Sequence, residues 1–342
     1  MIMLVRSVAL ALVLSLVQLP PPAPRAATVA TVDRDAVIRQ AAGITRLHAL
    51  IVAKDGQVVV ERRLRGASLD RPVNIKSASK SVLSALAGIA IERGMLEGTD
   101  QPIISLLGDD VPEDADPMVG RITVGHLLSM QAGLSSTSGR NYGAWVLSRN
   151  WVRYVLGRPF DSVPGGRMIY STGTSHLLSA VLTKASGRST LALAREWLGE
   201  PLGITIPAWP RDPQGIYFGG NDMLMSPRAL LAFGELYRND GMVAGRRVLP
   251  EGWVAETWRK RAVSAWTGDD YGYGWFSRPA GGHMAHFAWG YGGQMVFVVP
   301  SLGLTVVMTS DPSPRPRGDG HMDQLHDLLD DIILMEVQGG ES

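Results

Sequence analysis

A serine and a lysine three positions apart begin an apolar segment of the sequence. Ser77 and Lys80 lie in "NIKSASKS", and "VLSALAGIAIERG" follows directly with no acidic residue before Glu92. On a helix, positions i and i+3 lie on one face, so the two side chains can meet without help from other elements. A serine hydroxyl becomes a nucleophile when a base takes its proton, and a lysine becomes a base when burial destabilises its ammonium. The pattern therefore indicates a nucleophile and its base at the start of a buried helix.

The same two residues could also be a helix-capping serine and a solvated lysine, because S-x-x-K is a short pattern. The composition favours the chemical interpretation, since only five of the 33 lysine and arginine residues are lysine. A lysine therefore rarely falls three residues after a serine by chance in this chain. The free N–H groups of a helix N-terminus would also stabilise negative charge at Ser77.

Two further segments could complete a catalytic site. Tyr170 lies in "PGGRMIYSTGTSHLL", just before a predicted helix, and a tyrosine beside a lysine can relay protons. Taken alone, Tyr170 could equally be a core aromatic residue with a satisfied hydroxyl. "AWGYGGQMVFVVP" places a cluster of glycines before a predicted strand, and glycines let a backbone approach a ligand closely. Taken alone, this cluster could be a tight turn.

The elements that must position these residues can be predicted from periodicity. "TRLHALIVAKDGQVVVERRL" contains two β-rich runs around Asp-Gly, which is a strong hairpin signal. A helix is expected over about 78–94, helical patterns fill most of 100–264, and strand patterns return over 271–311. Helix candidates within 100–264 include "TVGHLLSMQAGL", "STGTSHLLSAVLTKASG" and "SPRALLAFGELYRNDG". The last is expected to begin with Ser226 as its N-cap and Pro227 at the first helical position. "HMDQLHDLLDDIILMEV" is then expected to form an amphipathic helix.

This order favours an α/β (α+β) fold in which the first and last parts of the chain form one antiparallel sheet flanked by helices. We expect one domain over 33–338. Its sheet lobe would span about 33–97 and 265–338, and an inserted, mostly helical lobe would span about 98–264. A cleft between the two lobes would be a favoured place for a site.

Together these segments resemble a known superfamily. "SASKSVLSALAGIAIERGML" is similar to the serine β-lactamases and penicillin-binding proteins, specifically the class C β-lactamase-like hydrolases. That branch includes esterases, D-aminopeptidases and 6-aminohexanoate-dimer hydrolases. "ITVGHLLSMQAGL", "PGGRMIYSTGTSHLLSAVLTKASG" and "GYGGQMVFVVP" follow in the family's order, over roughly residues 45–335. The resemblance implies a β-lactamase/transpeptidase-like fold.

The resemblance also implies a role for each matching residue. Ser77 matches the acylated nucleophile and Lys80 its partner in S-x-x-K. Tyr170 matches the tyrosine of the Y-x-N motif, whose asparagine is replaced by Thr172 in the substrate-binding region. The backbone N–H groups of Ser77 and Tyr291 would form the oxyanion hole.

A third motif departs further from the family pattern. Ala288, Trp289 and Gly290 fall where the family has K-T-G or H-x-G, on a strand beside the cleft. In β-lactam and D-peptide processing, the basic residue of that motif helps to hold the substrate carboxylate, and here Ala288 replaces it. The loss favours an esterase or amidase. Trp289 would offer an apolar or stacking surface, and His286 could restore some polarity.

Composition argues against other classes of function. The formal net charge is +1, with 45% hydrophobic and 19% charged residues, so the chain is globular and unlike a nucleic-acid-binding protein. The absence of cysteine excludes disulfides, thiol catalysis and cysteine zinc sites. The histidine pairs His283/His286 and His321/His326 are interpreted as surface or structural residues, and no G-x-S-x-G, H-E-x-x-H or phosphate-loop motif is present. We therefore expect no metal and no organic cofactor.

The first 30 residues have the layout of a secretory signal followed by a processing linker. Arg6 precedes an apolar run over 7–19, and prolines and small residues follow. The run is shorter than the roughly 20 residues that a membrane-spanning helix needs. Cleavage near Ala26, Ala27 or Ala30 would give a secreted or periplasmic protein without stable membrane association. The alternative is an uncleaved N-terminal anchor.

The sequence thus predicts a secreted serine hydrolase that cleaves an ester or amide bond of a small molecule or short peptide through an acyl-enzyme on Ser77. Lys80 and Tyr170 would share the proton transfers and, as a close pair, titrate as one unit. Two alternatives stay open. One is a true β-lactamase or D,D-carboxypeptidase, and the other is a catalytically silent module that binds cell-wall material or peptides.

Overall fold

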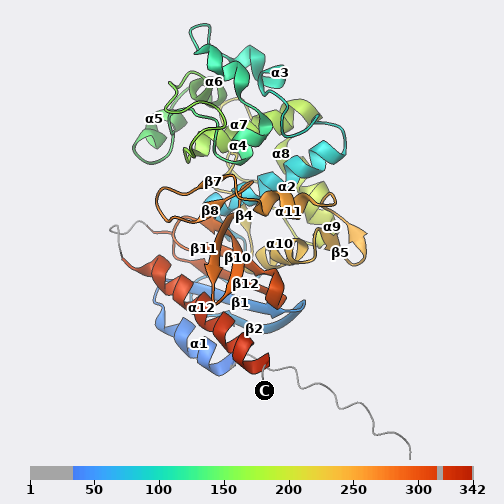
Figure 1. The fold of residues 1–342 in the computed structure, drawn as a ribbon, viewed down its shortest axis with the longest axis vertical. Helices are drawn as coiled ribbons and strands as arrows, with labels where there is room; N and C mark the ends of the chain where they lie inside the picture. The colour runs from blue at the N-terminus through green and yellow to red at the C-terminus, as the bar shows by residue number, and fades with distance from the viewer. Residues whose placement is uncertain (1–33, 314–318, 341–342) are drawn as a thin grey trace, which may run out of the picture.

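The computed structural model describes residues 34–313 and 319–340, and the predicted signal region lies outside them. A large sheet with its covering helices forms one half of the molecule, and a group of shorter helices forms the other (Figure 1). Helix α2 (Ser79–Glu92) lies between the two halves. None of the helices described is long and apolar enough to span a bilayer.

The sheet has eight strands in the order β2-β1-β12-β11-β10-β9-β8-β7, and its neighbouring strands are antiparallel. The strands are β1 (Leu47–Lys54), β2 (Gln57–Arg63), β7 (Ala262–Val263), β8 (Asp270–Tyr271), β9 (Phe276–Ala280), β10 (His283–Gly290), β11 (Gln294–Val299) and β12 (Leu304–Ser310). β1 pairs with β12, with Leu47 opposite Ser310. The expected union of the first and last parts of the chain in one antiparallel sheet is therefore confirmed.

Alternating side chains bury both faces of this sheet. Along β11, Met295 and Phe297 face one core cluster, and Val296 and Val298 face the other. Helices α1 (Arg34–Gly43) and α12 (His321–Gly340) cover the first face, whereas α2 and α10 (Pro227–Arg238) cover the second. The predicted Asp-Gly hairpin joins β1 to β2, and its turn uses positive φ angles of 48° and 81° at Asp55 and Gly56.

Short helices make up the other half of the molecule. They are α3 (Ile104–Leu107), α4 (Val124–Leu128), α5 (Tyr142–Val146), α6 (Trp151–Leu156), α7 (Thr172–Ser186) and α8 (Thr190–Ala194). Two more short helices lie nearer the sheet, α9 (Glu200–Leu202) beside α10 and α11 (Trp253–Trp258) beside α2. The longest, α7, ends at the left-handed Gly187, as the sequence predicts. The segment "TVGHLLSMQAGL" gives only the five residues of α4, because the chain turns through positive φ angles at Met130 and Gly133.

Helix α10 departs from the expected lobe boundaries. It begins as predicted, with the Ser226 hydroxyl accepting a hydrogen bond from the Ala229 N–H and with Pro227 at the first helical position. It packs on the sheet, however, because Gly234 has no side chain: a Cβ there would lie 2.7 Å from Cγ2 of Thr305 on β12. Residues 227–238 therefore belong to the sheet layer and not to the helical lobe expected over 98–264.

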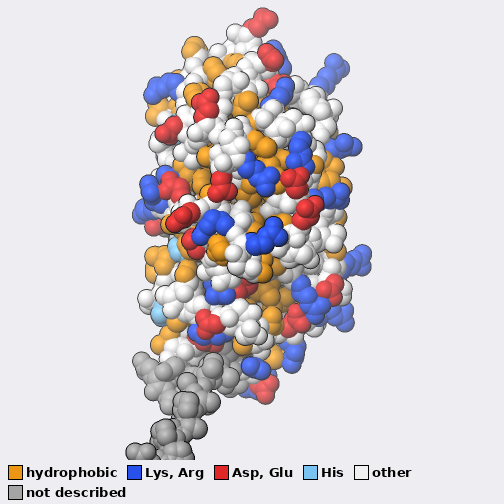
Figure 2. All heavy atoms as spheres, turned by 90° about the vertical axis from the view of Figure 1, so that its right-hand side faces the viewer, with side chains coloured by type: hydrophobic (Ala, Val, Ile, Leu, Met, Phe, Trp, Pro, Cys, Tyr) orange, Lys and Arg blue, Asp and Glu red, His pale blue; other side chains and the backbone are white. Residues whose placement is uncertain are grey.

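The face drawn in Figure 2 carries lysine and arginine side chains interspersed with aspartate and glutamate. Among the described residues visible there, the basic groups form no continuous stripe of the kind that tracks a nucleic-acid backbone. The mixed surface agrees with the formal net charge of +1.

Candidate active site

Ser77 lies on a turn that is held in an uncommon backbone conformation. Lys76, directly before it, has a φ of 51°, a region that costs free energy for a residue other than glycine. The Lys76 N–H donates to the Asn74 side-chain oxygen at 2.9 Å, and its ammonium donates to Asp222 at 3.0 Å. Asn74 in turn donates to the same Asp222 oxygen at 2.7 Å. These contacts hold the turn that presents Ser77 at the start of α2.

Lys80 follows one turn later and points back at the serine. Its Nζ lies 3.0 Å from Ser77 Oγ and donates to the carbonyl of Gly220 at 2.6 Å. The residue is 4% exposed, and no carboxylate in the described part of the chain forms a hydrogen bond or ion pair with it. Burial lowers the pKa of Lys80 to about 7, so the amine can lose its proton near neutral pH.

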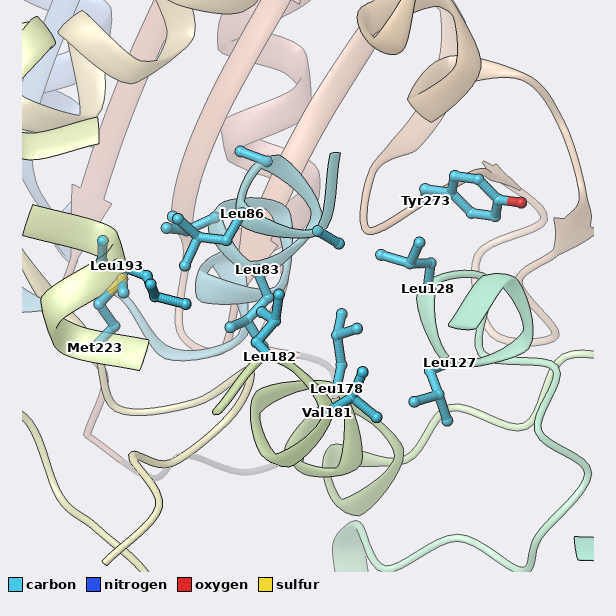
Figure 3. Packing of buried hydrophobic residues seen from close by; sticks show 14 of the residues in the cluster. Leu83, Leu86, Leu127, Leu128, Leu178, Val181, Leu182, Leu193, Met223 and Tyr273 are labelled. Atoms are coloured by element: carbon cyan, nitrogen blue, oxygen red, sulfur yellow. The ribbon is translucent and has the colours of Figure 1, made fainter. Parts of the chain in front are cut away.

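The burial of Lys80 comes from the apolar residues of α2. Figure 3 shows Leu83 and Leu86 of this helix packed among Leu178, Val181 and Leu182 of α7. Leu127 and Leu128 of α4 close the same cluster. The buried helix predicted from "VLSALAGIAIERG" is therefore present, and it removes water from the lysine at its N-terminal end.

Tyr170 lies just before α7 and completes the group. Its ring centroid is 4.8 Å from Lys80 Nζ, and its hydroxyl is hydrogen-bonded to the Ser77 side chain. Burial raises the pKa of Tyr170 to about 12, opposed by the bond to Ser77. The phenol therefore stays protonated at neutral pH, and Lys80 is the residue of this pair that can act as a base there.

The glycine-rich segment lies beside the nucleophile, as the sequence suggested. A Cβ on Gly290 would lie only 2.1 Å from the carbonyl oxygen of Ile75, so the end of β10 runs directly against the backbone that leads to Ser77. Tyr291 follows at this point and lines the same pocket as Ser77. This proximity favours an oxyanion hole formed by the backbone N–H groups of Ser77 and Tyr291.

A pocket of about 790 Å³ opens over Ser77. Its aromatic wall consists of Tyr142, Tyr170, Trp266, Phe276, Trp289 and Tyr291. Its polar wall includes Lys76, Ser138, Thr172, Asn221 and Asp222. The cation of Lys76 is paired with Asp222, so the pocket is apolar and close to neutral.

Of the remaining predicted site residues, some line the pocket and one lies in the core. Thr172 lines the pocket, and its hydroxyl lies 3.0 Å from that of Ser138. Ala288 is 1% exposed and packs in the core, so the structure does not support a substrate contact by its side chain. Because side chains alternate along β10, the neighbouring Trp289 faces the pocket instead.

His286 does not restore polarity to the pocket, contrary to the expectation from its sequence position. It points to the same side of β10 as Ala288 and stacks on Trp258 with ring centroids 4.0 Å apart. Its Nδ1 lies 2.7 Å from Ser277 Oγ, and burial lowers its pKa to about 4. Over residues 34–313 and 319–340, no three histidine, aspartate or glutamate side chains come together as a candidate metal site.

Sequence patterns missed the loop "GGND", residues 219–222. This loop gives the carbonyl that binds Lys80, the carboxylate that pairs with Lys76, and Asn221 in the pocket wall. A Cβ on Gly220 would lie 2.4 Å from Ser175 Cβ and 2.9 Å from Lys80 Cγ, so only glycine fits. The glycine pair was the available signal, but nothing in the sequence ties it to Lys80.

Comparisons with known proteins agree with this geometry. A family model described as Beta-lactamase matches residues 35–330. Similar solved structures include EstCE1, a hydrolase with promiscuous acyltransferase activity (19% identity, 86% of this chain and 97% of that chain, TM-score 0.69). A family VIII carboxylesterase is also similar (17% identity, 87% of this chain and 97% of that chain, TM-score 0.68). So is a penicillin-binding protein homologue from Caulobacter crescentus (17% identity, 89% of this chain and 98% of that chain, TM-score 0.69). At these identities the structural likeness establishes the fold.

Proposed function

The chain belongs to the beta-lactamase family of hydrolases, and from that premise we propose that it is a serine hydrolase that cleaves an ester or amide through an acyl-enzyme on Ser77. One observation carries the proposal: the Ser77 hydroxyl is in contact with both the Lys80 amine and the Tyr170 hydroxyl. A nucleophile bonded to a base that can be neutral near pH 7 is what acyl transfer requires.

Acylation uses these groups in order. The neutral amine of Lys80 accepts the Ser77 proton as Oγ attacks the substrate carbonyl, and the resulting oxyanion is held by the backbone N–H groups of Ser77 and Tyr291. When the tetrahedral intermediate collapses, the ammonium of Lys80 returns the proton to the leaving alkoxide or amine through the Tyr170 hydroxyl. The products of this half-reaction are the free alcohol or amine and an ester on Ser77.

Deacylation repeats the sequence with water as the nucleophile. Lys80 is again the neutral amine and accepts a proton from the attacking water, with Tyr170 between them as the relay. The second tetrahedral intermediate then expels Ser77 Oγ, which regains a proton. This step returns Ser77 to its hydroxyl form and Lys80 to its neutral form.

The pocket supports a neutral substrate with an apolar or aromatic group. Six aromatic side chains line it, and its cation, Lys76, is occupied by Asp222. A substrate carboxylate would therefore meet no free positive charge among the lining residues. This counts against a true β-lactamase or D,D-carboxypeptidase, whose substrates carry that carboxylate. The intact group around Ser77 counts against a silent binding module.

The test compares the unaltered protein with Ser77→Ala on a matched set of substrates. The set is p-nitrophenyl butyrate, p-nitrophenyl phenylacetate, a chromogenic cephalosporin and a D-alanyl-D-alanine peptide. We expect turnover of the two neutral esters and none in Ser77→Ala, and intact mass should show one fluorophosphonate adduct, on Ser77. Equal hydrolysis by Ser77→Ala would refute the mechanism. Preferred cleavage of the cephalosporin or the peptide would favour a true β-lactamase or D,D-carboxypeptidase. The absence of both turnover and an adduct would favour the silent binding module.

We also propose that the protein is exported, with its signal removed between Ala26 and Ala30. The support is the layout of the first 30 residues in the sequence. N-terminal sequencing of the protein recovered from the periplasm or medium of an expressing bacterium tests this. A start at residue 1 in the membrane fraction would instead indicate an uncleaved anchor.

A further inference from the structure

A buried histidine–aspartate pair lies behind the active site. His176 on α7 and Asp212 are both 0% exposed at their side chains, and His176 Nε2 lies 2.9 Å from Asp212 Oδ2. The aromatic rings of three residues surround the imidazole, with centroid distances to it of 5.9 Å for Trp145, 5.3 Å for Trp151 and 6.0 Å for Phe218. Neither side chain lines the pocket, and the mechanism above uses neither.

The hydrogen bonds define the proton positions on this pair. The Gly219 N–H donates to His176 Nδ1 at 3.2 Å, so Nδ1 carries no proton and the proton of the neutral ring is on Nε2, facing Asp212. The other Asp212 oxygen accepts the N–H groups of Gln214 and Ile216 at 2.9 and 2.8 Å. The Asp212 carboxylate thus accepts three hydrogen bonds, one from the His176 ring and two from the backbone of the loop that contains Gln214 and Ile216.

The pair holds the loop that reaches Lys80. Gly219 is bonded to His176, and the next residue, Gly220, places its carbonyl 2.6 Å from Lys80 Nζ. The fit is close, because a Cβ on Gly219 would lie 2.6 Å from the Cα of His176. One peptide unit therefore separates the imidazole from the oxygen that contacts the catalytic amine.

We propose that His176 and Asp212 are positioning residues that hold the Gly220 carbonyl on Lys80 and thereby aim the amine at Ser77. A neutral amine has two N–H groups and one lone pair. When one N–H is held by the Gly220 carbonyl, rotation of the amine is restricted and the lone pair can face Ser77 Oγ at 3.0 Å. The inference rests on the proposed function, since it assigns the pair a part in activating Ser77.

Asp212→Asn tests the proposal with almost no change of shape. If the new amide N–H₂ faces His176, the ring must carry its proton on Nδ1, and that N–H then meets the N–H of Gly219. If the amide is turned the other way, the N–H groups of Gln214 and Ile216 lose their acceptor. Either arrangement displaces the loop. We expect kcat for p-nitrophenyl butyrate to fall about 100-fold, the loss typical of a 1 Å misplacement, with KM changed less than about threefold.

A pH profile separates positioning from general destabilisation. Burial alone depresses the pKa of Lys80, so a displaced loop that admits water should raise it, and the acid limb of kcat/KM should move up by about half a unit or more. Val152→Ala, a buried truncation in α6 of the helical half, is the matched control and should leave the limb in place. The proposal would be overturned if Asp212→Asn left the acid limb of kcat/KM in place and kept kcat within threefold of the unaltered protein.

A second pair of variants decides the matter if Asp212→Asn does not fold. His176→Gln keeps an acceptor for the Gly219 N–H, whereas His176→Leu does not, so we expect the glutamine variant to retain about tenfold more kcat. Equal kcat in the two would contradict the proposal. Fluorophosphonate labelling distinguishes the levels of failure: no adduct on Ser77 of the unaltered protein refutes the proposed function, whereas equal labelling rates in all variants refute the positioning role alone.

Discussion

Two lysines in opposite regions of this molecule each donate to a backbone carbonyl, and they differ in burial and in their second partner. Lys54, at the end of β1, donates to the carbonyl of Leu302 at 2.6 Å and lies 3.2 Å from the carboxylate of Glu336 on α12. Lys80, in the cleft, donates to a carbonyl at the same distance, 2.6 Å, but its second contact is the Ser77 hydroxyl. The backbone contact is shared. Lys80 is more deeply buried, at 4% exposed against 22% for the side chain of Lys54, and no carboxylate of the described residues contacts it.

The comparison indicates how a base is made from lysine here. A carboxylate within hydrogen-bond distance favours the ammonium form, which suits a structural link between β1 and α12. Without that carboxylate, burial is the dominant influence and lowers the pKa of Lys80 to about 7. We infer that the absence of an acid around Lys80 is as necessary to the chemistry as the presence of Ser77.

Removing Lys80 should produce the largest effect. Lys80→Met fills the same space without a base, and kcat/KM for a neutral ester should fall by about 10⁴-fold, the upper range for loss of general-base catalysis. Steady-state hydrolysis of p-nitrophenyl butyrate measures this. Activity within tenfold of the unaltered protein would show that another group takes the Ser77 proton.

The same variant should change how stability depends on pH. The pKa of Lys80 is lowered on folding from its ordinary 10.5 to about 7, so between these values the unfolded chain binds the proton and the folded chain does not. Stability should therefore gain from this residue as pH rises from about 7 to 10.5. In Lys80→Met this contribution is absent, so the midpoint temperature of the unaltered protein should rise relative to that of the variant across that range.

Tyr170→Phe should have the next largest effect. It removes the hydroxyl that contacts Ser77 and relays the proton but keeps the ring beside Trp266, with ring centroids 5.2 Å apart. We expect kcat to fall about 10³-fold with little change in KM. Because the pKa of Tyr170 is raised to about 12, the unaltered protein should show no alkaline limb from this residue below pH 10. A limb there that Tyr170→Phe abolishes would mean that the tyrosinate takes part.

A carboxylate placed beside Lys80, like the one beside Lys54, should favour the ammonium form of Lys80. Ser175 is suited to this, because its buried Oγ has no hydrogen-bond partner among the residues that the structure describes and lines the same small cavity as Lys80. In Ser175→Asp the new carboxylate should raise the pKa of Lys80 by about two units and lower activity at pH 7 about 100-fold, with recovery above pH 9. Ser175→Asn, of equal size and no charge, is the control. An equal loss in both variants, without recovery at high pH, would contradict the comparison.

Removing the acid from the other lysine should affect stability alone. Glu336→Gln removes the carboxylate that lies 3.2 Å from the Lys54 ammonium, and the free energy of unfolding should drop by about 1 kcal/mol, the upper end for an ion pair with a solvent-accessible partner. Denaturant unfolding measures the drop, and kcat should be unchanged. Asp55→Asn is the matched control, since Asp55 lies 4.0 Å from the same ammonium and its side chain is 70% exposed, so its loss should be near zero. Loss of activity in Glu336→Gln would mean that the two regions are coupled.

Much of the fold could be predicted because its signals are local. The Asp-Gly hairpin, the apolar α2 and the capped start of α10 each follow from a few adjacent residues. Ser77 and Lys80 could be paired for the same reason, since one helical turn joins them. The sheet registry and the position of α10 on the sheet depend on contacts between distant segments, such as Gly234 against Thr305, and no local pattern reports them.

The limits of sequence reasoning at the site follow the same division. Trp266 and the loop at 219–222 reach the pocket from segments without a motif. Ala288 was assigned to the pocket and lies in the core, because the family's motif gives the position on the strand but not the face that each side chain takes. Alternation along β10 from Trp289, which lines the pocket, would have assigned that face correctly.

The central pairing of β1 with β12 has a consequence for synthesis. Arg46, just before β1, donates to the carbonyl of Asp311, just after β12, and the two residues are 265 positions apart. A chain emerging from the ribosome therefore cannot complete its sheet until β12 has been made, and the early β1–β2 hairpin must wait with one edge open. During that interval the nascent hairpin offers an unpaired strand, which is where a chaperone would act and where premature association would begin.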